Sequence, residues 1–452
     1  MLLSLTIENY RSFATEAVLD LQKRSFRTNL PKSGSWAGVT ERIAGLYGPN
    51  ASGKSTVLRA LSVLQSAVYS SVQNHGTVRA LRTPHALHPD DETFFEVEYV
   101  RGGIRYRWSV TLTDEGVTEE TLEAVGGAGA SAHWRRLFTR TGQEISFGQH
   151  FGVPKAAREN IEQFLGPWVL ALSAWRLVRD PGPYVGAAQW WFRQLRIAPT
   201  EGLHPDPGTL HTEMVQLMVN PRWSTAAKAV LGAADVGVTG VRIVEEELPA
   251  DTLRILHAVR DALNDDGDDT EESEARKFRI DEVRKSLEFN HVAGQDAFPL
   301  REDDESRGTR FWLDLALMAV RSLVLGEVLV IDELDASLHP ALVRFFIDLF
   351  LTEATNPSGA QLVFTSHDVT SLGNTLGEGR LPESTVWLVD KRNAESVLVC
   401  LDEYNLRLGG KSNMEKRYLE GAFGAMPIIG AEIENAIAAL HDELESSKKV
   451  TD

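Results

Sequence analysis

Alternating apolar and polar residues predict a series of strands in the first part of the chain. Leu3, Leu5 and Ile7 alternate with polar residues, which is typical of a half-buried strand. Gly102-Gly103 separates two longer β-like runs and predicts a hairpin. We therefore expect an antiparallel sheet, with strands at 3–7, 17–21, 94–100, 104–112, 118–124, 135–140 and 144–147.

The pattern changes twice along the rest of the chain. Residues 151–300 have a helical and irregular character, and the acidic run at 261–274 predicts a solvated loop. After residue 300 the chain returns to alternating α and β elements. Helices are expected at 311–325, 341–351, 415–419 and 430–444, and strands at 328–331, 361–364 and 386–389. The predicted organisation is lobe I at 1–150, a mostly helical insertion or arm at 151–300, and lobe II at 301–452.

The most specific motif lies between an apolar strand at 43–47 and a helical pattern that follows it. Residues 48–55 read Gly-Pro-Asn-Ala-Ser-Gly-Lys-Ser, which fits the phosphate-binding loop G-x-x-x-x-G-K-[S/T]. Backbone N–H groups and a helix N-terminus bind phosphate in such a loop. We expect Lys54 to reach the β- and γ-phosphates of a bound nucleotide and Ser55 to bind Mg²⁺. Further nucleotide contacts are expected from Gly48, Asn50, Ala51, Ser52, Gly53 and Thr56.

Carboxylates at the end of a second strand complete the predicted site. The apolar run 328–331 leads into Asp332 and Glu333. In a parallel sheet, ligands gather beyond the carboxyl ends of the strands. Asp332 is expected to help hold Mg²⁺ and Glu333 to act as general base toward water. His367 follows the next strand at the same edge, either as a phosphate sensor or as a structural residue.

The predicted site needs residues from distant parts of the chain and from a second subunit. More than half of the chain separates Lys54 from Asp332, so the two ends of the chain must fold together around a large insertion. Ser306 and Gly308 form a Ser-x-Gly turn that opens a predicted helix and presents an anion cradle, although an ordinary capped helix has the same pattern. Because the phosphate loop serves its own site, this cradle is expected to face a nucleotide on another subunit.

Composition narrows the classes of partner. The 452-residue chain has a net charge of −18, which disfavours a DNA-coating surface but leaves a local basic groove open. The single cysteine, Cys400, lies in an apolar run and is expected to be buried in a strand. One cysteine cannot form a disulfide framework, which suggests that the protein works in a reducing cytoplasm. No signal peptide or membrane span is expected. Basic residues that could face DNA, but fit the solvent face of a sheet better, are Arg101, Arg105, Arg107, Arg135 and Arg136.

Together these motifs resemble the ABC-ATPase-like heads of the SMC, RecF and overcoming-lysogenization-defect (OLD) families. Residues 7–13 resemble their opening strand and turn, 305–309 an OLD-like signature motif, and Asp332-Glu333 the Walker B motif. Residues 335–340, beginning at Asp335, resemble the D-loop, and His367 the switch histidine. The resemblance implies an α/β fold of ABC type with an antiparallel β lobe. It also implies an ATPase that uses ATP and Mg²⁺ and forms a homodimer or higher oligomer through its heads.

The end of the chain adds a second resemblance. Residues 403–427 are similar to the C-terminus of stand-alone bacterial ATPases related to OLD, many encoded beside an effector gene in anti-phage systems such as PARIS. This implies a separate effector partner, a nuclease or a toxin. A RecF-like DNA-repair ATPase is the alternative, and a non-hydrolysing scaffold is disfavoured by Glu333.

Two departures from these families matter. The sequence does not assign the glutamine-loop residue; the candidates are Gln65, Gln73 and the turn at 85–90. The segment after residue 366 lacks the metal cluster of a Toprim domain, so nuclease activity of the chain itself is not expected.

Overall fold

The computed structural model describes most of the chain. The described residues are 1–127, 131–198, 207–234, 237–247, 251, 253–255, 258, 283–293, 296–336, 338–373, 381–404, 413–425, 433 and 436–441. The predicted acidic loop at 261–274 and most of the predicted helix at 430–444 lie outside them.

The first lobe contains a seven-stranded antiparallel sheet, with the order β2-β1-β4-β5-β6-β7-β8. The predicted hairpin is confirmed, since β4 and β5 pair across Gly102 and Gly103, whose φ angles of 59° and 80° suit a tight two-residue turn. The strands are β1 (Leu2–Glu8), β2 (Ala17–Asp20), β4 (Thr93–Arg101), β5 (Ile104–Thr113), β6 (Gly116–Gly126), β7 (His133–Thr141) and β8 (Glu144–Phe147).

The central sheet joins both ends of the chain, as the sequence predicts. Its order is β16-β15-β3-β14-β13-β9, and only β16 runs antiparallel to its neighbour. The strands are β3 (Ile43–Tyr47), β9 (Leu195–Ile197), β13 (Val328–Ile331), β14 (Gln361–Ser366), β15 (Val386–Arg392) and β16 (Glu395–Cys400). The parallel strands are buried on both faces, which explains their unbroken apolar runs.

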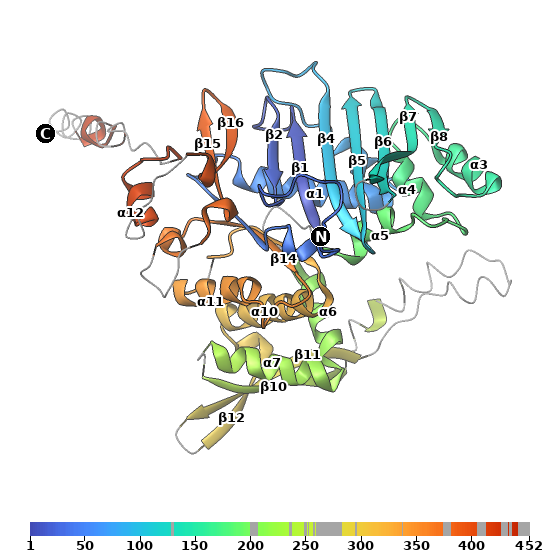
Figure 1. The fold of residues 1–452 in the computed structure, drawn as a ribbon. Helices are drawn as coiled ribbons and strands as arrows, with labels where there is room; N and C mark the ends of the chain where they lie inside the picture. Colours follow the sequence, from blue (N-terminus) through green and yellow to red (C-terminus); the bar gives the residue numbers. More distant parts are fainter. Residues whose placement is uncertain are drawn as a thin grey trace, which may run out of the picture.

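Alternate residues of the central strands enter two different cores. Val328 and Val330 pack into a core shared with the antiparallel sheet and α1 (Lys54–Ser70), whereas Leu329 and Ile331 face α10 (Arg307–Leu325) and α11 (Pro340–Leu351). The layers are thus antiparallel sheet, helices, central sheet and helices (Figure 1). This mixed architecture confirms the predicted α/β class. Within the described residues, no helix is both long enough and apolar enough to cross a membrane.

The segment 151–300 differs from the expected helical arm. Its first part packs into the first core through α3 (Lys155–Phe164), α4 (Ala171–Arg176) and α5 (Gly186–Arg193), and it supplies β9 to the central sheet. The second part contains α6 (Pro207–Met218), α7 (Pro221–Ala233) and an antiparallel sheet of β10 (Val238–Glu247), β11 (Val283–Ala293) and β12 (Asp296–Arg301). Buried Leu287 and Phe289 alternate with half-buried polar residues along β11, a strand period hidden within a polar stretch.

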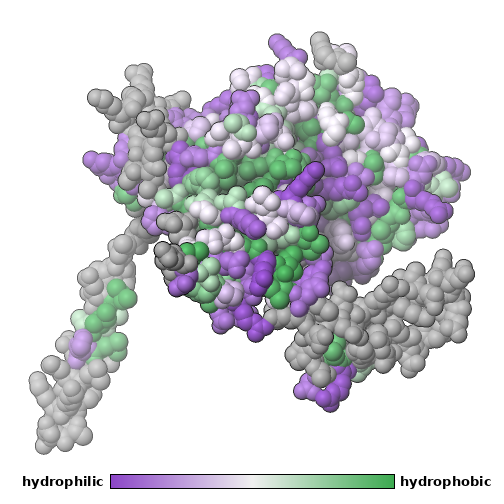
Figure 2. All heavy atoms as spheres, turned by 90° about the horizontal axis from the view of Figure 1, so that it is seen from below, coloured by the Kyte–Doolittle hydropathy of each residue, from purple (hydrophilic) through white to green (hydrophobic). Residues whose placement is uncertain are grey.

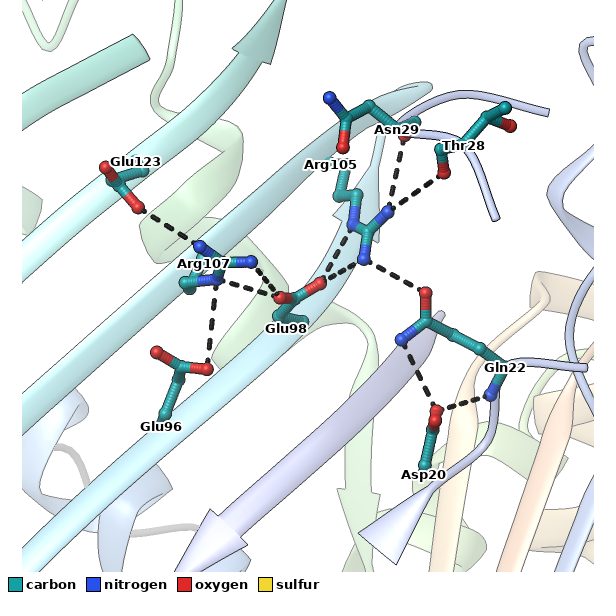
Figure 3. Close-up of polar contacts among 9 residues, drawn as sticks. All are labelled: Asp20, Gln22, Thr28, Asn29, Glu96, Glu98, Arg105, Arg107 and Glu123. Carbon is teal, nitrogen blue, oxygen red and sulfur yellow. Dashed lines mark hydrogen bonds and ion pairs between the residues drawn. The ribbon is translucent and has the colours of Figure 1, made fainter. Parts of the chain in front are cut away.

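Two arginines of the antiparallel sheet, Arg105 and Arg107, form ion pairs with carboxylates. The side chain of Arg105 is only 9% exposed and forms an ion pair with Glu98. Arg107 donates to Glu98 at 2.8 Å and also pairs with Glu96 and Glu123 (Figure 3). The interpretation of Arg105 as a solvent-facing residue is therefore wrong, because a neighbouring carboxylate allows its burial.

The described segment 413–425 packs into the second core through the short helix α12 (Met414–Leu419) and the residues that follow it. Cys400 is buried in β16, as the sequence predicts, and burial raises the pKa of its thiol to about 12.

Candidate nucleotide-binding site

A cleft of about 790 Å³ opens at the carboxyl edge of the central sheet. β3, β14 and β13 are parallel neighbours, so their following loops meet at this edge. The residues that line the cleft are Arg11, Ser12, Asn50, Ala51, Ser52, Gly53, Lys54, Ser55, Thr56, Glu333 and His367. Residues from both ends of the chain thus share one cleft, as the sequence predicts.

The loop between β3 and α1 has a backbone that only small residues tolerate. Gly48 has a φ of 156°, and a Cβ there would lie 2.1 Å from the carbonyl oxygen of Val389. Gly53 has a φ of 112° and is enclosed by the hydroxyls of Ser396 and Ser12. The motif glycines therefore permit both the curvature of the loop and its close packing against β15 and β16.

The ammonium of Lys54 is held inside this loop. Its Nζ donates to the carbonyl oxygens of Gly48 at 2.8 Å and Pro49 at 3.0 Å. Burial lowers the pKa of Lys54, and the nearby carboxylates of Asp332, Glu333 and Asp335 oppose that shift. An ammonium binds charged phosphate oxygens more strongly than neutral carbonyls, so phosphate can replace these two acceptors.

Oxygen donors that suit Mg²⁺ lie beside Lys54. The hydroxyl of Ser55 donates to Oδ1 of Asp332 at 3.0 Å, across 277 residues of sequence. The hydroxyl of Thr365, on β14, donates to the same oxygen at 2.5 Å and fixes the buried carboxylate. A hydroxyl and a carboxylate fit this hard cation, which binds protein through a few oxygens and keeps several waters.

Glu333 has an unusual backbone and an exposed side chain. Its φ is 52°, a left-handed value that is uncommon outside glycine and often marks a functional residue. Its N–H donates to Oγ1 of Thr365 at 2.7 Å, so β14 holds the turn in place. Glu333 is exposed, and it lines the cleft together with His367.

The carboxylate of Asp335 holds the backbone of His367. Its backbone N–H lies 3.2 Å from both carboxylate oxygens of Asp335. Asp335 is not part of the cleft lining among the described residues, and its visible role is to hold the turn after β14.

Three cleft-side residues were not assigned a role from sequence. Arg11 and Ser12 follow β1 and line the cleft, and Arg11 brings a cation to it. The backbone of Arg11 has a φ of 55° and donates to the carbonyl of Thr83 at 2.7 Å. Ser396, on β16, donates to the carbonyl of Ser52 at 2.5 Å. The family-like pattern at 7–13 indicates that Arg11 and Ser12 matter. No sequence pattern indicates Ser396, because it lies 344 positions from Ser52, its hydrogen-bond partner.

The Ser-x-Gly turn lies apart from this cleft. Ser306 caps α10 by accepting the N–H of Thr309 at 3.0 Å, and its residue surface is exposed. Neither Ser306 nor Gly308 belongs to the cleft lining in the described part of the chain. This placement leaves the turn available to another molecule.

The glutamine-loop candidates are also outside the lining. Gln65 uses its side-chain amide to donate to the carbonyls of Trp191 and Leu195 at 2.5 and 2.9 Å, which is a structural role. Neither Gln73 nor the turn at 85–90 lines the cleft as described.

The sequence matches one family model over residues 43–168 and 233–372, more than half of the chain. That family is described as "AAA domain, putative AbiEii toxin, Type IV TA system". The chain belongs to this AAA-domain family. The assignment fits the phosphate loop, which falls inside the first matched segment, and Asp332, Glu333 and His367, which fall inside the second. It identifies an ATPase-type domain, and ATP with Mg²⁺ is the ligand pair that such domains use.

The other comparisons find distant likeness. None of the curated proteins compared with the chain is a significant match. An SMC head domain from Thermotoga maritima is 11% identical, with a TM-score of 0.39 over 88% of this chain and 98% of that one. An SmcHead bound to the C-winged helix domain of ScpA is 12% identical, with a TM-score of 0.40 over 89% and 99%. A third Smc head, bound to a ScpA domain derived from Pyrococcus furiosus, is 12% identical, with a TM-score of 0.37 over 89% and 97%.

Ser396 offers a test of how β16 supports this family's phosphate loop. We expect Ser396→Ala to weaken ATP binding about fivefold, because a buried hydrogen bond to the loop contributes roughly 1 kcal/mol. Titration calorimetry with ATP measures the change. Thr15→Ala is the matched control, since Thr15 bonds to Glu395 at the same hairpin without touching the loop. Equal affinities for Ser396→Ala and the unaltered chain would remove Ser396 from this role.

Proposed function

We propose that the chain binds Mg²⁺-ATP in this cleft and hydrolyses its β–γ bond. The observation that carries the proposal is the gathering of Lys54, Ser55, Asp332, Glu333 and His367 at one sheet edge. The cation of Lys54 offsets charge that develops on the phosphate oxygens. Glu333 accepts a proton from the attacking water, and His367 contacts the γ-phosphate or that water. Mg²⁺, held at Ser55 and Asp332, supplies further neutralisation of phosphate charge.

Hydrolysis in this proposal needs a second copy of the chain. Ser306 and Gly308 present an N-capped helix start on the surface, outside their own cleft. In a head-to-head dimer each turn closes over the triphosphate bound at Lys54 of the other subunit. ATP then joins the two heads and hydrolysis releases them, so the useful output is a change of assembly.

The partner that responds to this change is proposed to be a separately encoded effector, a nuclease or toxin, in anti-phage defence. The family description gives the putative toxin as the family itself and names a type IV toxin–antitoxin system, which supports a separately encoded second component. An apolar band lies near the middle of the face in Figure 2, bordered by hydrophilic side chains. Exposed apolar surface of this kind supports a protein partner.

A RecF-like role on DNA is the alternative. Arg105 and Arg107, on the antiparallel sheet, form ion pairs with carboxylates. Paired arginines neutralise few DNA phosphates, so these two residues do not support DNA binding.

Mixing two inactive variants tests the composite site. Lys54→Ala removes the ammonium that binds phosphate in the cleft. Gly308→Asp blocks the turn that faces the other subunit, so each variant alone is expected to be inactive. Their mixed dimer contains one intact site, and random mixing restores about a quarter of the unaltered turnover. Phosphate release at constant total protein measures it.

The matched control mixes Lys54→Ala with Glu333→Gln. Both residues lie in the same subunit's cleft, so neither site of that mixed dimer is intact and no turnover should return. A mixture of Lys54→Ala and Gly308→Asp that stays inactive would contradict the shared site.

A further inference from the structure

One carboxylate connects the three-stranded sheet to the turn that carries Ser306. Nε2 of His291, on β11, lies 2.6 Å from Oε2 of Glu305, and the other oxygen of Glu305 accepts the N–H of Ser306 at 2.8 Å. The side chains of His291 and Glu305 are only 15% and 6% exposed. Hydrogen bonds to a charged group in such a place are among the stronger ones in proteins.

Further contacts hold the same region of α10. Oε2 of Glu302 accepts the backbone N–H of Leu287 at 3.0 Å, so β11 is bonded to the segment just before the turn. The indole N–H of Trp312 donates to the carbonyl of Val230, on α7, at 2.9 Å. Leu287, Phe289 and Trp312 also share one core. Several contacts therefore join the start of α10 to the three-stranded sheet and to α7.

The β11–β12 hairpin projects away from the two large sheets (Figure 1). Phe298, on β12, stacks on the ring of His291 with centroids 5.6 Å apart, while 42% of its surface stays exposed. Phe298 is therefore linked to the backbone of Ser306 by a chain of two contacting side chains, His291 and Glu305.

We propose that His291 and Glu305 are positioning residues that set the Ser306–Gly308 turn for the nucleotide held by another copy of the chain. The inference rests on the dimer proposed above. The carboxylate of Glu305 fixes the direction of the Ser306 N–H, and His291 fixes the carboxylate. Without this pair the turn loses its orientation toward the other subunit, while the cleft at Lys54 keeps its own geometry.

The test begins with His291→Ala, which removes the ring that holds Glu305. Turnover is expected to fall about tenfold or more, the effect of losing a charge-assisted hydrogen bond. The affinity for ATP, measured by calorimetry on the single chain, should stay unchanged. His291→Gln keeps an amide N–H near the position of Nε2 and should restore most of the turnover. Arg242→Ala, which breaks an exposed ion pair in the same sheet, is the matched control and should have no effect.

Mixing separates positioning across the dimer from a general structural defect. Lys54→Ala supplies an intact turn, so it should rescue His291→Ala, whereas Gly308→Asp should not. The inference is overturned if His291→Ala keeps full turnover, or if Lys54→Ala fails to rescue it while still rescuing Gly308→Asp. If Lys54→Ala fails to rescue Gly308→Asp as well, the proposed dimer fails first.

Discussion

Glu333→Gln is expected to abolish most ATP turnover while ATP binding stays nearly unchanged. An amide cannot accept the proton of the attacking water, and a positioned general base contributes about 10²–10⁴-fold to such reactions. Glutamine keeps the size of the side chain and its place on a turn that Thr365 holds from β14. The phosphate contacts of Lys54 and the hydroxyl of Ser55 are not altered.

Phosphate release and calorimetric ATP titration measure the two effects separately. Glu353→Gln makes the same chemical change at an exposed residue outside the cleft and should behave as the unaltered chain. Turnover of Glu333→Gln at the unaltered rate would show that another group activates the water.

Glu120→Ala is expected to destabilise the first lobe by about 3–5 kcal/mol, the usual effect of breaking one partner from a buried ion pair. Glu120 and Arg140 both have fully buried side chains and lie 3.6 Å apart. Glu120 also accepts the N–H groups of Ala171 and Leu172, at 2.6 and 2.9 Å, and the indole N–H of Trp108. Its loss would leave the Arg140 guanidinium without its carboxylate partner, with only backbone carbonyls as acceptors. It would also leave the N–H groups at the start of α4 and the indole of Trp108 without their acceptor.

Urea unfolding followed by tryptophan fluorescence measures this change. Glu119→Ala, one position earlier on β6 and exposed, is the control, and it should shift the free energy of unfolding by no more than about 0.5 kcal/mol. A stability loss for Glu120→Ala as small as that of Glu119→Ala would mean that the buried pair does not hold the lobe together.

The gathering of the phosphate-loop residues and Glu333 at one cleft could be predicted from sequence because it depends on short local patterns. The glycines at 48 and 53, and the acids directly after an apolar strand, occupy places that the backbone dictates once β3 and β13 are parallel. The separation of Lys54 from Asp332 also predicted correctly that the chain ends share one sheet.

The parts that sequence missed depend on distant pairing. β9 has only three residues, and its neighbour β13 follows more than a hundred residues later, so no local period reveals it. The sheet of β10, β11 and β12 lies in a segment that the sequence predicts to be mostly helical and irregular. Few of its residues are buried, so its strands show little of the alternation that predicts a strand. The support that Ser396 gives to the phosphate loop, and the link between His291 and Glu305, arise only when these strands are in place.

The most direct test of the account is the mass of Glu333→Gln in solution with and without Mg²⁺-ATP, measured by light scattering. One chain has a mass of 50.0 kDa. The account predicts that ATP doubles this mass, because the nucleotide joins two heads that can no longer release each other. A mass that stays at that of one chain when Mg²⁺-ATP is present would contradict a site closed by a second copy of the chain.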